Sequence, residues 1–443
     1  MRRNYFKKLV AMILVGMMVF GLAGCSAETT DTPAANAGGD SGQEQITLTM
    51  VEQITSPERT ALLKELIAKY EETHPNIKVE LISPPLNTAA QKLEAMFMAE
   101  QKMDIYEVRE VPYRDVNNGY IVPLNQYIDE WDEWDTVSDA FKSAITADDG
   151  NVYSLPYGGY QRTLFYRKDW FEEAGLEVPT TWEELYQAGV KLTDPSKNRY
   201  GYSFRGNIGT GGYLLNTGFS WMDDNKIDRS DSLITKDGRS MFEDPDFVEG
   251  IKFYKKLYED ASPEDSIAWG YPEMVENFYS GVTAMLIQDP EVIATCIDHM
   301  EEGSWDTAPM PVGPNGKSYF PFGFAGWGIP SHSEHQQEAF EFIAYLSSAE
   351  VNTYFCKNNG SIPIHVTASM DPFFTEGYYA SYLKMSQNAD SFIGLKSSGM
   401  KFIEEKEAMY TILDASTQAM LIGDITPEEL AAELAEPFKN INK

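Results

Sequence analysis

The sequence predicts an α/β fold, in which strands of largely parallel sheets alternate with covering helices. Apolar residues alternate in a strand pattern at 46–51 and again at 77–81, and a helical pattern lies between them. This strand-helix-strand order indicates a parallel pair of strands. About 400 residues follow the amino-terminal segment, more than one hydrophobic core usually holds, so we expect two lobes.

The first elements can be justified residue by residue. Ile46, Leu48 and Met50 alternate with polar residues, as in a half-buried strand. The run Thr-Ser-Pro-Glu at 55–58 has the pattern of a capping box with an early proline, which indicates the start of a helix. His74-Pro75 ends that helix, because proline cannot continue it, and the second strand follows.

The later elements continue the same pattern. A helix over 88–102 leads to a third strand at 104–108. Capping residues followed by apolar residues at helical spacing predict further helices that begin near residues 181, 244, 333 and 426.

The amino terminus has the order of an export signal. Basic residues without any acidic one precede an uncharged apolar run over 9–23, which is shorter than the roughly 20 residues of a membrane-spanning helix. The run ends in Leu-Ala-Gly-Cys at 22–25, which resembles the lipobox of bacterial lipoproteins. The resemblance implies a signal peptide over 1–24, a lipid on Cys25 and an anchor on the extracellular side of the cell membrane. Residues 25–45 are small and polar, so we expect a flexible tether.

Composition narrows the partners of the chain. The formal net charge is −33, so the surface repels nucleic acid, and we expect no nucleic-acid partner. Only Cys296 and Cys356 follow Cys25, and we favour two buried free thiols over a disulfide between them. Aromatic residues make up 13% of the chain, a supply on which a sugar-binding cleft would draw.

Catalytic and metal-binding patterns are few. The sequence contains no HExxH, GxSxG or GxGxxG pattern, and the run 316–318 lacks the first glycine of a phosphate loop. His332 and His335 are three residues apart but have no companion ligand at metal-binding spacing. We therefore expect no metal, no cofactor and no enzymatic activity. A pair of acids near a cleft keeps a surface glycosidase or lyase as the alternative.

Several segments stand in an order and spacing typical of one protein family. They are the runs YEETHPNI at 70–77, GYIVPL at 119–124, YSLPY at 153–157, LFYRKDWF at 164–171, FYSGVTAM at 278–285, GWGIP at 326–330 and GSIP at 360–363. Together they resemble the family 1 extracellular solute-binding proteins, the sugar-receptor subunits of bacterial ABC importers. Arg167-Lys168 departs from the Asn-Lys common in that family, and Gln161-Arg162-Thr163 matches no sugar pattern, so maltose is not implied.

The resemblance implies a type II periplasmic binding protein fold, in which two α/β lobes joined by hinge crossings close on a ligand. It implies a first lobe over 46–155 plus 287–362 and a second over 156–286 plus 363–443. It also implies a monomeric receptor that captures a carbohydrate, in the first instance an oligosaccharide, and delivers it to ABC permease subunits. A receptor for a non-sugar solute stays open as a further alternative.

Candidate ligand-binding residues follow strands or lie beside glycines. Ligands of open α/β sheets lie beyond the carboxyl ends of strands, where this chain has Glu52, Glu107 and Arg109. Planar polar groups bind paired sugar hydroxyls, and aromatic faces stack on sugar rings. We expect a carbohydrate between these three residues and an aromatic wall that includes Tyr157 and Trp269. The full candidate set is Glu52, Glu107, Arg109, Tyr157, Tyr160, Arg205, Trp221, Trp269, Asp289, Phe322, Phe324 and Trp327.

Overall fold

The computed structural model describes residues 45–109, 111–229, 231–321, 323–388, 390–395 and 402–441. From Gln45 onward these residues form one compact unit. The predicted signal peptide, Cys25 and Phe322 lie outside the described residues, as does the tether up to residue 44.

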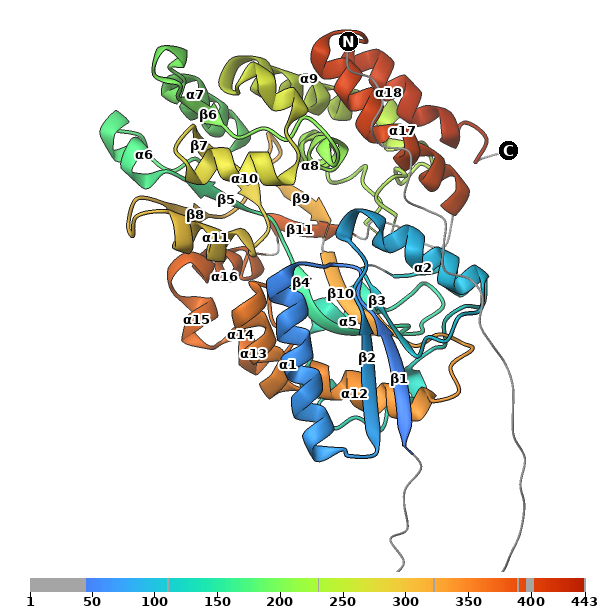
Figure 1. Ribbon diagram of the computed structural model, residues 1–443. Coiled ribbons are helices and arrows are strands. Elements are labelled where there is room, and N and C mark those ends of the chain that lie inside the picture. The colour runs from blue at the N-terminus through green and yellow to red at the C-terminus, as the bar shows by residue number, and fades with distance from the viewer. Residues whose placement is uncertain are drawn as a thin grey trace, which may run out of the picture. The chain divides into compact units, whose positions relative to one another are not determined.

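The first sheet has the strand order β2-β1-β3-β10-β4, and its strands are β1 (Ile46–Val51), β2 (Ile77–Ile82), β3 (Ile105–Val108), β4 (Leu155–Tyr160) and β10 (Gly323–Gly328). β1 pairs in parallel with both β2 and β3, so the predicted strand-helix-strand unit is confirmed. β10 runs antiparallel to β3 and to β4. The carboxyl ends of β1 and β3 therefore lie at one edge of the sheet (Figure 1).

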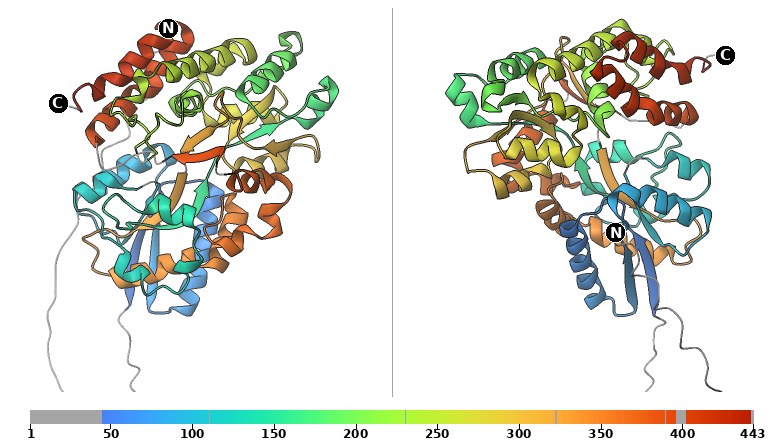
Figure 2. Two further views of the ribbon diagram at one scale, coloured as in Figure 1. Left: turned by 180° about the vertical axis from the view of Figure 1, so that it is seen from behind. Right: turned by 45° about the horizontal axis from the view of Figure 1, so that its top comes forward.

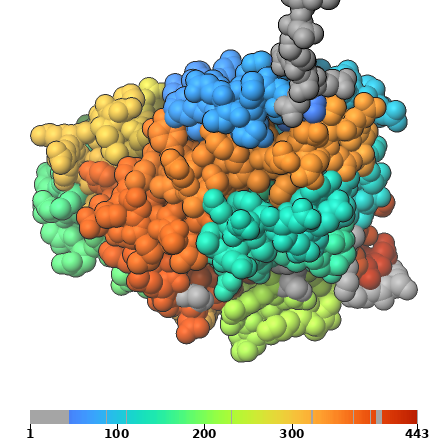
Figure 3. Space-filling model, turned by 90° about the horizontal axis from the view of Figure 1, so that it is seen from below, coloured from blue at the N-terminus to red at the C-terminus, as the bar shows by residue number. Residues whose placement is uncertain are grey.

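Helices cover this sheet: α1 (Pro57–Thr73), α2 (Ala89–Met98), α3 (Tyr113–Asn117), α4 (Asn125–Ile128), α5 (Asp139–Ile145), α12 (Gln336–Ser347) and α13 (Ala349–Asn359). α1 packs against α12 and α13 through an apolar face that buries Leu63, Leu66 and Tyr70. The Tyr70 ring meets Phe342 of α12 at 4.9 Å between centroids. Figure 3 shows α1, in blue, beside the orange surface of this part of the chain.

The second sheet has the order β6-β7-β5-β8, and its strands are β5 (Thr163–Tyr166), β6 (Tyr200–Tyr202), β7 (Thr283–Gln288) and β8 (Asp306–Ala308). The helices in the same stretch of chain are α6 (Lys168–Ala174), α7 (Trp182–Leu192), α8 (Thr210–Trp221), α9 (Pro245–Ala261), α10 (Tyr271–Tyr279) and α11 (Val292–His299). α7 and β6 touch backbone to backbone, because a Cβ on Gly201 would lie only 2.0 Å from the Gly189 carbonyl oxygen.

The carboxyl-terminal part adds short helices and a small sheet. Its elements are α14 (Val366–Ser369), α15 (Pro372–Thr375), α16 (Ala380–Ser386), α17 (Ile403–Ile422), α18 (Pro427–Ala435) and the parallel pair β9 (Ser318–Pro321) and β11 (Phe392–Leu395). α17 packs on α8, where Leu413 fills the space beside Gly211. Figure 2 shows the red helices α17 and α18 next to α8 and α9.

The chain passes from the first main sheet to the second at a short crossing, and a second short connection follows β7. β4 ends in the first sheet at Tyr160 and β5 begins in the second at Thr163, so Gln161 and Arg162 form one crossing. β7 ends at Gln288, and the run 289–291 leads from it into α11. β8 pairs antiparallel with β5 in the second sheet, although we expected the chain from residue 287 onward in the first lobe. A division by sheets would keep 287–308 with the second sheet, and the exact lobe boundaries stay a prediction.

Helix starts follow the predicted capping residues with two corrections, the first being α12, whose cap residue is His335 and makes no side-chain capping hydrogen bond. Thr181 and Thr426 open α7 and α18 with complete capping boxes, as predicted. The run 55–58 does not form one, because Ser56 is the cap residue and accepts a hydrogen bond from the backbone N–H of Arg59. Arg59 thus occupies the position that a capping glutamate would need, and its side chain turns into the protein.

Arg59 is the centre of a buried ion network in the first sheet. Its guanidinium donates to Glu52 at the end of β1 and to Glu107 in β3, each at 2.6 Å. It also donates to the hydroxyl of Tyr157 in β4 at 2.7 Å, and that hydroxyl donates to Glu107. The two glutamates have no exposed surface. Burial lowers the pKa of Arg59, but the Glu107 and Glu52 charges outweigh it, so the pKa is raised and the ion persists.

Both predicted free thiols are confirmed. Cys296 and Cys356 are buried and unpaired. Burial raises the pKa of each thiol to about 12, so both stay protonated at neutral pH and are poor nucleophiles.

The Arg59 network predicts a large difference between two matched charge deletions. Arg59→Met leaves Glu52 and Glu107 buried without their cation, and should lower the free energy of unfolding by about 3–5 kcal/mol. Lys69→Met removes the exposed ion pair with Glu65 in the same helix and the contact with the Tyr354 ring, and should cost far less because solvent screens both. Urea unfolding of both variants measures this. Equal losses would contradict the account.

Candidate functional site

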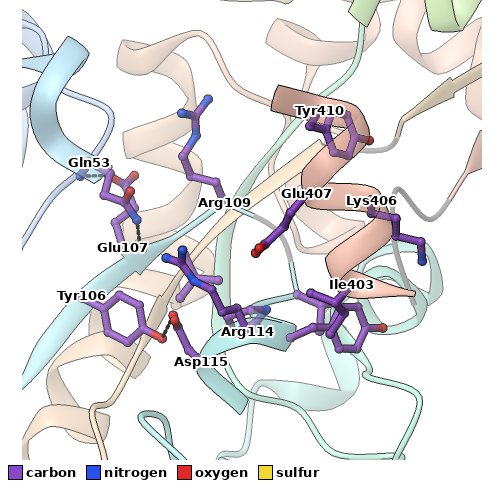
Figure 4. Close-up of a pocket in the computed structure, with 14 residues that line it drawn as sticks. Gln53, Tyr106, Glu107, Arg109, Arg114, Asp115, Ile403, Lys406, Glu407 and Tyr410 are labelled. Carbon is purple, nitrogen blue, oxygen red and sulfur yellow. Dashed lines mark hydrogen bonds between the residues drawn. The ribbon is translucent and has the colours of Figure 1, made fainter. Parts of the chain in front are cut away.

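A pocket opens where β1 and β3 end, as the position of ligands in α/β sheets predicts. It encloses ≈ 510 Å³ and its labelled lining in Figure 4 comprises Gln53, Tyr106, Glu107, Arg109, Arg114, Asp115, Ile403, Lys406, Glu407 and Tyr410. We refer to it as the strand-end pocket. The first sheet supplies one wall and the first turns of α17 supply the other.

The polar side chains of this pocket differ in how many hydrogen bonds they already form within the protein. Glu107 accepts hydrogen bonds from the backbone N–H groups of Gln53, at 2.5 Å, and Ile54, at 2.7 Å, and thereby fixes the loop after β1. Arg109 is exposed and forms no ion pair or hydrogen bond with any described residue. Glu407 points into the pocket from α17 (Figure 4). Arg109 is therefore the candidate with the most donors left for a ligand.

Four residues of the candidate set belong instead to the Arg59 network or pack on it. Glu52 uses both carboxylate oxygens, one for Arg59 and one for the Thr60 hydroxyl at 2.6 Å. Trp327 stacks on Tyr157 at 5.0 Å between ring centroids. Glu52, Glu107, Tyr157 and Trp327 are all at most 2% exposed. The structure brings these four together, and what it shows for them is packing and charge pairing inside the first sheet.

A second group of charged and aromatic side chains gathers at the crossings between the sheets. Arg162 leaves the β4–β5 crossing and lies 4.0 Å from Asp289, which follows β7. Its guanidinium lies over the ring of Tyr213 at 3.8 Å. Asn216, one turn further along α8, accepts from Arg162 at 3.1 Å when its amide is oriented to satisfy both groups. Sequence order alone did not predict this contact.

Arg205, Tyr271 and Glu291 complete this group. Tyr271 at the start of α10 donates its hydroxyl to Glu291 at 3.4 Å. Arg205 lies 6.0 Å from the centre of the Tyr271 ring, and its Nε donates to the carbonyl of Ile208 at 2.6 Å. We define the crossing cluster as Arg162, Arg205, Tyr213, Tyr271, Asp289 and Glu291.

The two acids of the crossing cluster, Asp289 and Glu291, both have raised pKa values. Burial raises the pKa of Asp289, and the positive charges of Arg162, Arg205 and Arg109 oppose that rise. Burial, and then the Asp289 charge, raise the pKa of Glu291 to about 8. The influence of Arg109 on Asp289 places the strand-end pocket and the crossing cluster within electrostatic reach of one another.

Buried polar atoms in the crossing cluster lack partners among the described residues. They are the Tyr213 hydroxyl and the second carboxylate oxygen of Glu291, and the Gln288 amide nitrogen beside them is in the same state. Most buried polar atoms in proteins are hydrogen-bonded, and each unpaired one costs about 1–3 kcal/mol.

The remaining aromatic candidates are scattered. Trp221 packs against Trp182 and Phe253 beside a different cavity, and Trp269 is buried where its carbonyl accepts from the backbone of Asn207. Phe324 is buried in β10. Tyr160 is half-buried and its hydroxyl accepts from Asn359 at 3.3 Å. Their roles toward a ligand stay predictions.

The glycines beside Tyr157 serve internal packing. A Cβ on Gly158 would lie 2.9 Å from the Ser361 hydroxyl, and one on Gly159 would lie 2.6 Å from the Phe141 ring. The small side chains therefore admit neighbours of the first sheet, where we expected a ligand.

Metal binding finds no support in the described part of the chain, where no three His, Cys, Asp or Glu side chains gather in a geometry for an ion. His332 contacts the carbonyl of Gln101 instead. Across the described residues, every helix is too short or too polar to cross a bilayer.

Comparison with known proteins identifies the family. Residues 55–353 match the bacterial extracellular solute-binding protein family, and the chain belongs to it. The members and fold relatives found are substrate-binding proteins of ABC importers and not enzymes. The fold is that of the type II periplasmic binding proteins, as the sequence predicted.

Two sequence relatives and one solved structure illustrate the similarity to known solute-binding proteins. A putative binding protein of Brucella abortus is 23% identical, with 86% of this chain and 88% of the relative covered. A maltooligosaccharide ABC transporter solute-binding lipoprotein of Streptococcus pneumoniae is 24% identical, covering 83% of both chains. A solute-binding protein of Thermotoga lettingae bound to α-D-tagatose superposes with a TM-score of 0.74 at 22% identity, covering 90% of this chain and 100% of that one.

The raised pKa of Glu291 predicts how stability depends on pH. Folded protein keeps this carboxyl protonated up to about pH 8, whereas the unfolded chain loses the proton near its ordinary pKa of 4.5. The folded state thus binds more protons in that window, and its stability falls as pH rises through it. Glu291→Gln cannot ionise, so its stability relative to the parent should increase by about 1 kcal/mol or more from pH 5 to pH 8.

Urea unfolding across this pH range measures the effect. The exposed Glu302→Gln in the same region serves as the control and should show no such trend. A parent and Glu291→Gln curve that stay parallel at every pH would contradict the assignment.

Proposed function

We propose that the protein captures a carbohydrate, in the first instance an oligosaccharide, between the strand-end pocket and the crossing cluster, and delivers it to an ABC importer. The crossing cluster is the observation that carries the proposal. It places arginine and aspartate side chains, which bind paired hydroxyls, beside the rings of Tyr213 and Tyr271, at the crossings between two sheets. The maltooligosaccharide and tagatose receptors among the similar proteins support the substrate class.

Capture follows from the placement of these groups. Arg109 follows a strand of the first sheet, and Asp289 follows a strand of the second. A ligand that contacts both favours the arrangement in which the two approach each other, by its difference in affinity for the two states. We expect a dissociation constant on the order of micromolar, about −8 kcal/mol, which allows release to a permease.

The carboxylate of Asp289 gives the sharpest mutational test. Asp289→Asn removes a charged acceptor and should weaken binding of the best carbohydrate by about tenfold or more, since a hydrogen bond to a charged group contributes about 1.5–3 kcal/mol. Asp298→Asn on the exposed side of α11 is the matched control and should bind like the parent.

A thermal-shift screen of mono- and oligosaccharides on the parent protein identifies the best ligand. Calorimetry then measures the affinity of the parent and of both variants for that ligand. Unchanged affinity of Asp289→Asn would remove the crossing cluster from the site. Steady release of reducing ends from a bound oligosaccharide would favour the glycosidase alternative over a receptor.

We also propose that the receptor is anchored through a lipid on Cys25. The apolar run that ends in Leu-Ala-Gly-Cys supports this, and the small polar residues after it suit a tether. The Streptococcus pneumoniae relative, named as a lipoprotein, is consistent with it.

Cys25→Ser tests the anchor, because serine cannot carry a thioether-linked lipid. The variant should lose metabolic labelling by a lipid precursor and appear in the soluble fraction or as an unprocessed form. Normal labelling of the Ser variant would contradict the proposal.

A further inference from the structure

The charges of three arginines act on the Asp289 carboxylate at the proposed site. Arg162 lies 4.0 Å from Asp289, and the charges of Arg205 and Arg109 also act on that carboxylate. The three come from distant parts of the chain: the first crossing, the loop after β6 and the end of β3. One carboxylate cannot pair fully with three guanidinium groups, each of which offers five donors.

Donors of all three arginines remain free for a ligand. Arg109 has no hydrogen bond or ion pair with any described residue. Arg205 donates its Nε to the carbonyl of Ile208, lies against Gly209 and also faces the Tyr213 hydroxyl, which leaves part of its five donors for a ligand. Arg162 gives one terminal nitrogen to α8, at 3.4 Å from the Gly212 carbonyl. An unpaired guanidinium in a cleft is a site for a carboxylate or phosphate, which match its planar fork.

The other acids nearby do not balance these charges. Glu291 is largely uncharged at neutral pH and is held by Tyr271. Asp414 is occupied by the backbone N–H groups of Gly209 and Gly211, at 2.7 and 2.9 Å. Glu407 faces the strand-end pocket from an exposed position, where solvent screens it. Glu107 is paired with Arg59.

The local excess of arginine at this site is the opposite of the overall charge of the protein, which is strongly negative. The chain has 68 acidic and 35 basic residues, so a random surface patch is acidic. A local concentration of arginine with spare donors therefore requires a reason at this place. An anionic ligand supplies one, because it would neutralise the excess in a partly buried site.

Resting on the proposed function, we propose that the carbohydrate carries an acidic group, a carboxylate as in a hexuronate or a phosphate ester, which Arg109 and Arg205 bind while Arg162 holds Asp289 in place. The neutral hydroxyls of the sugar then face Asp289 and the rings of Tyr213 and Tyr271. Arg109 follows β3 of the first sheet and Arg205 follows β6 of the second. An acidic group bound by both arginines would therefore link the two sheets.

The test compares matched sugars by calorimetry at two salt concentrations. The pairs are hexuronic acids and their oligomers against the neutral hexoses and oligomers of the same linkage, with a hexose phosphate as a third arm. We expect an acidic member to bind at least tenfold more tightly than its neutral partner, and less tightly in high salt. The arm that binds best distinguishes a carboxylate from a phosphate.

Two arginine substitutions test whether Arg109 is responsible for the preference for acidic sugars. Arg109→Gln should weaken binding of the acidic sugar at least tenfold while folding normally, since Arg109 is exposed and unpaired. Arg239→Gln, which removes an exposed arginine paired with Asp237, should leave that affinity unchanged. Equal loss in both variants would overturn the inference.

Two outcomes distinguish a failure of this inference from a failure of the proposed carbohydrate-receptor function. If neutral sugars bind as tightly as acidic ones, the acidic group is not recognised and the inference fails, while the carbohydrate receptor stands. If no sugar of either kind binds, the proposed function itself fails.

Discussion

The Arg59 guanidinium, buried between two carboxylates, fixes the part of the molecule on which the site depends. It joins the ends of β1 and β3 through Glu52 and Glu107, and it reaches β4 through Tyr157. Glu107 in turn holds the backbone of Gln53 and Ile54. The strand-end pocket therefore has a rigid wall, and Arg109, two residues beyond Glu107, projects from a fixed base.

The crossings between sheets impose the second constraint. Arg162 sits where the chain passes from the first sheet to the second, and Asp289 follows β7 of the second sheet, so a shift of the first sheet relative to the second acts directly on the Arg162 crossing. Their charges are shared with Arg205 and Arg109, which belong to different sheets or loops. Under the proposed function, a ligand that completes this charge arrangement would stabilise one relative position of the two sheets.

Local patterns in the sequence predicted much of the fold. The alternation at 46–51 and the capping residues Thr181 and Thr426 depend only on near neighbours, and the structure confirms them. The site was harder to predict. Glu52 and Glu107 stand at strand ends, as ligand-binding acids do, but Arg59 from the first turn of α1 pairs with both. Arg162 meets Asp289 across more than a hundred residues, so no local pattern marked it, although the run 161–163 already resisted any sugar interpretation.

Hydrogen–deuterium exchange with the tightest-binding sugar tests the central claim most directly, because it maps the site without any substitution. The account predicts slower exchange at three separate segments, 107–109, 160–163 and 286–291, which the fold brings to the strand-end pocket and the crossings. Exchange at 181–183 and 249–256, beside the separate Trp221 cavity, should not change. Protection confined to that cavity, with the three segments unaffected, would contradict the account.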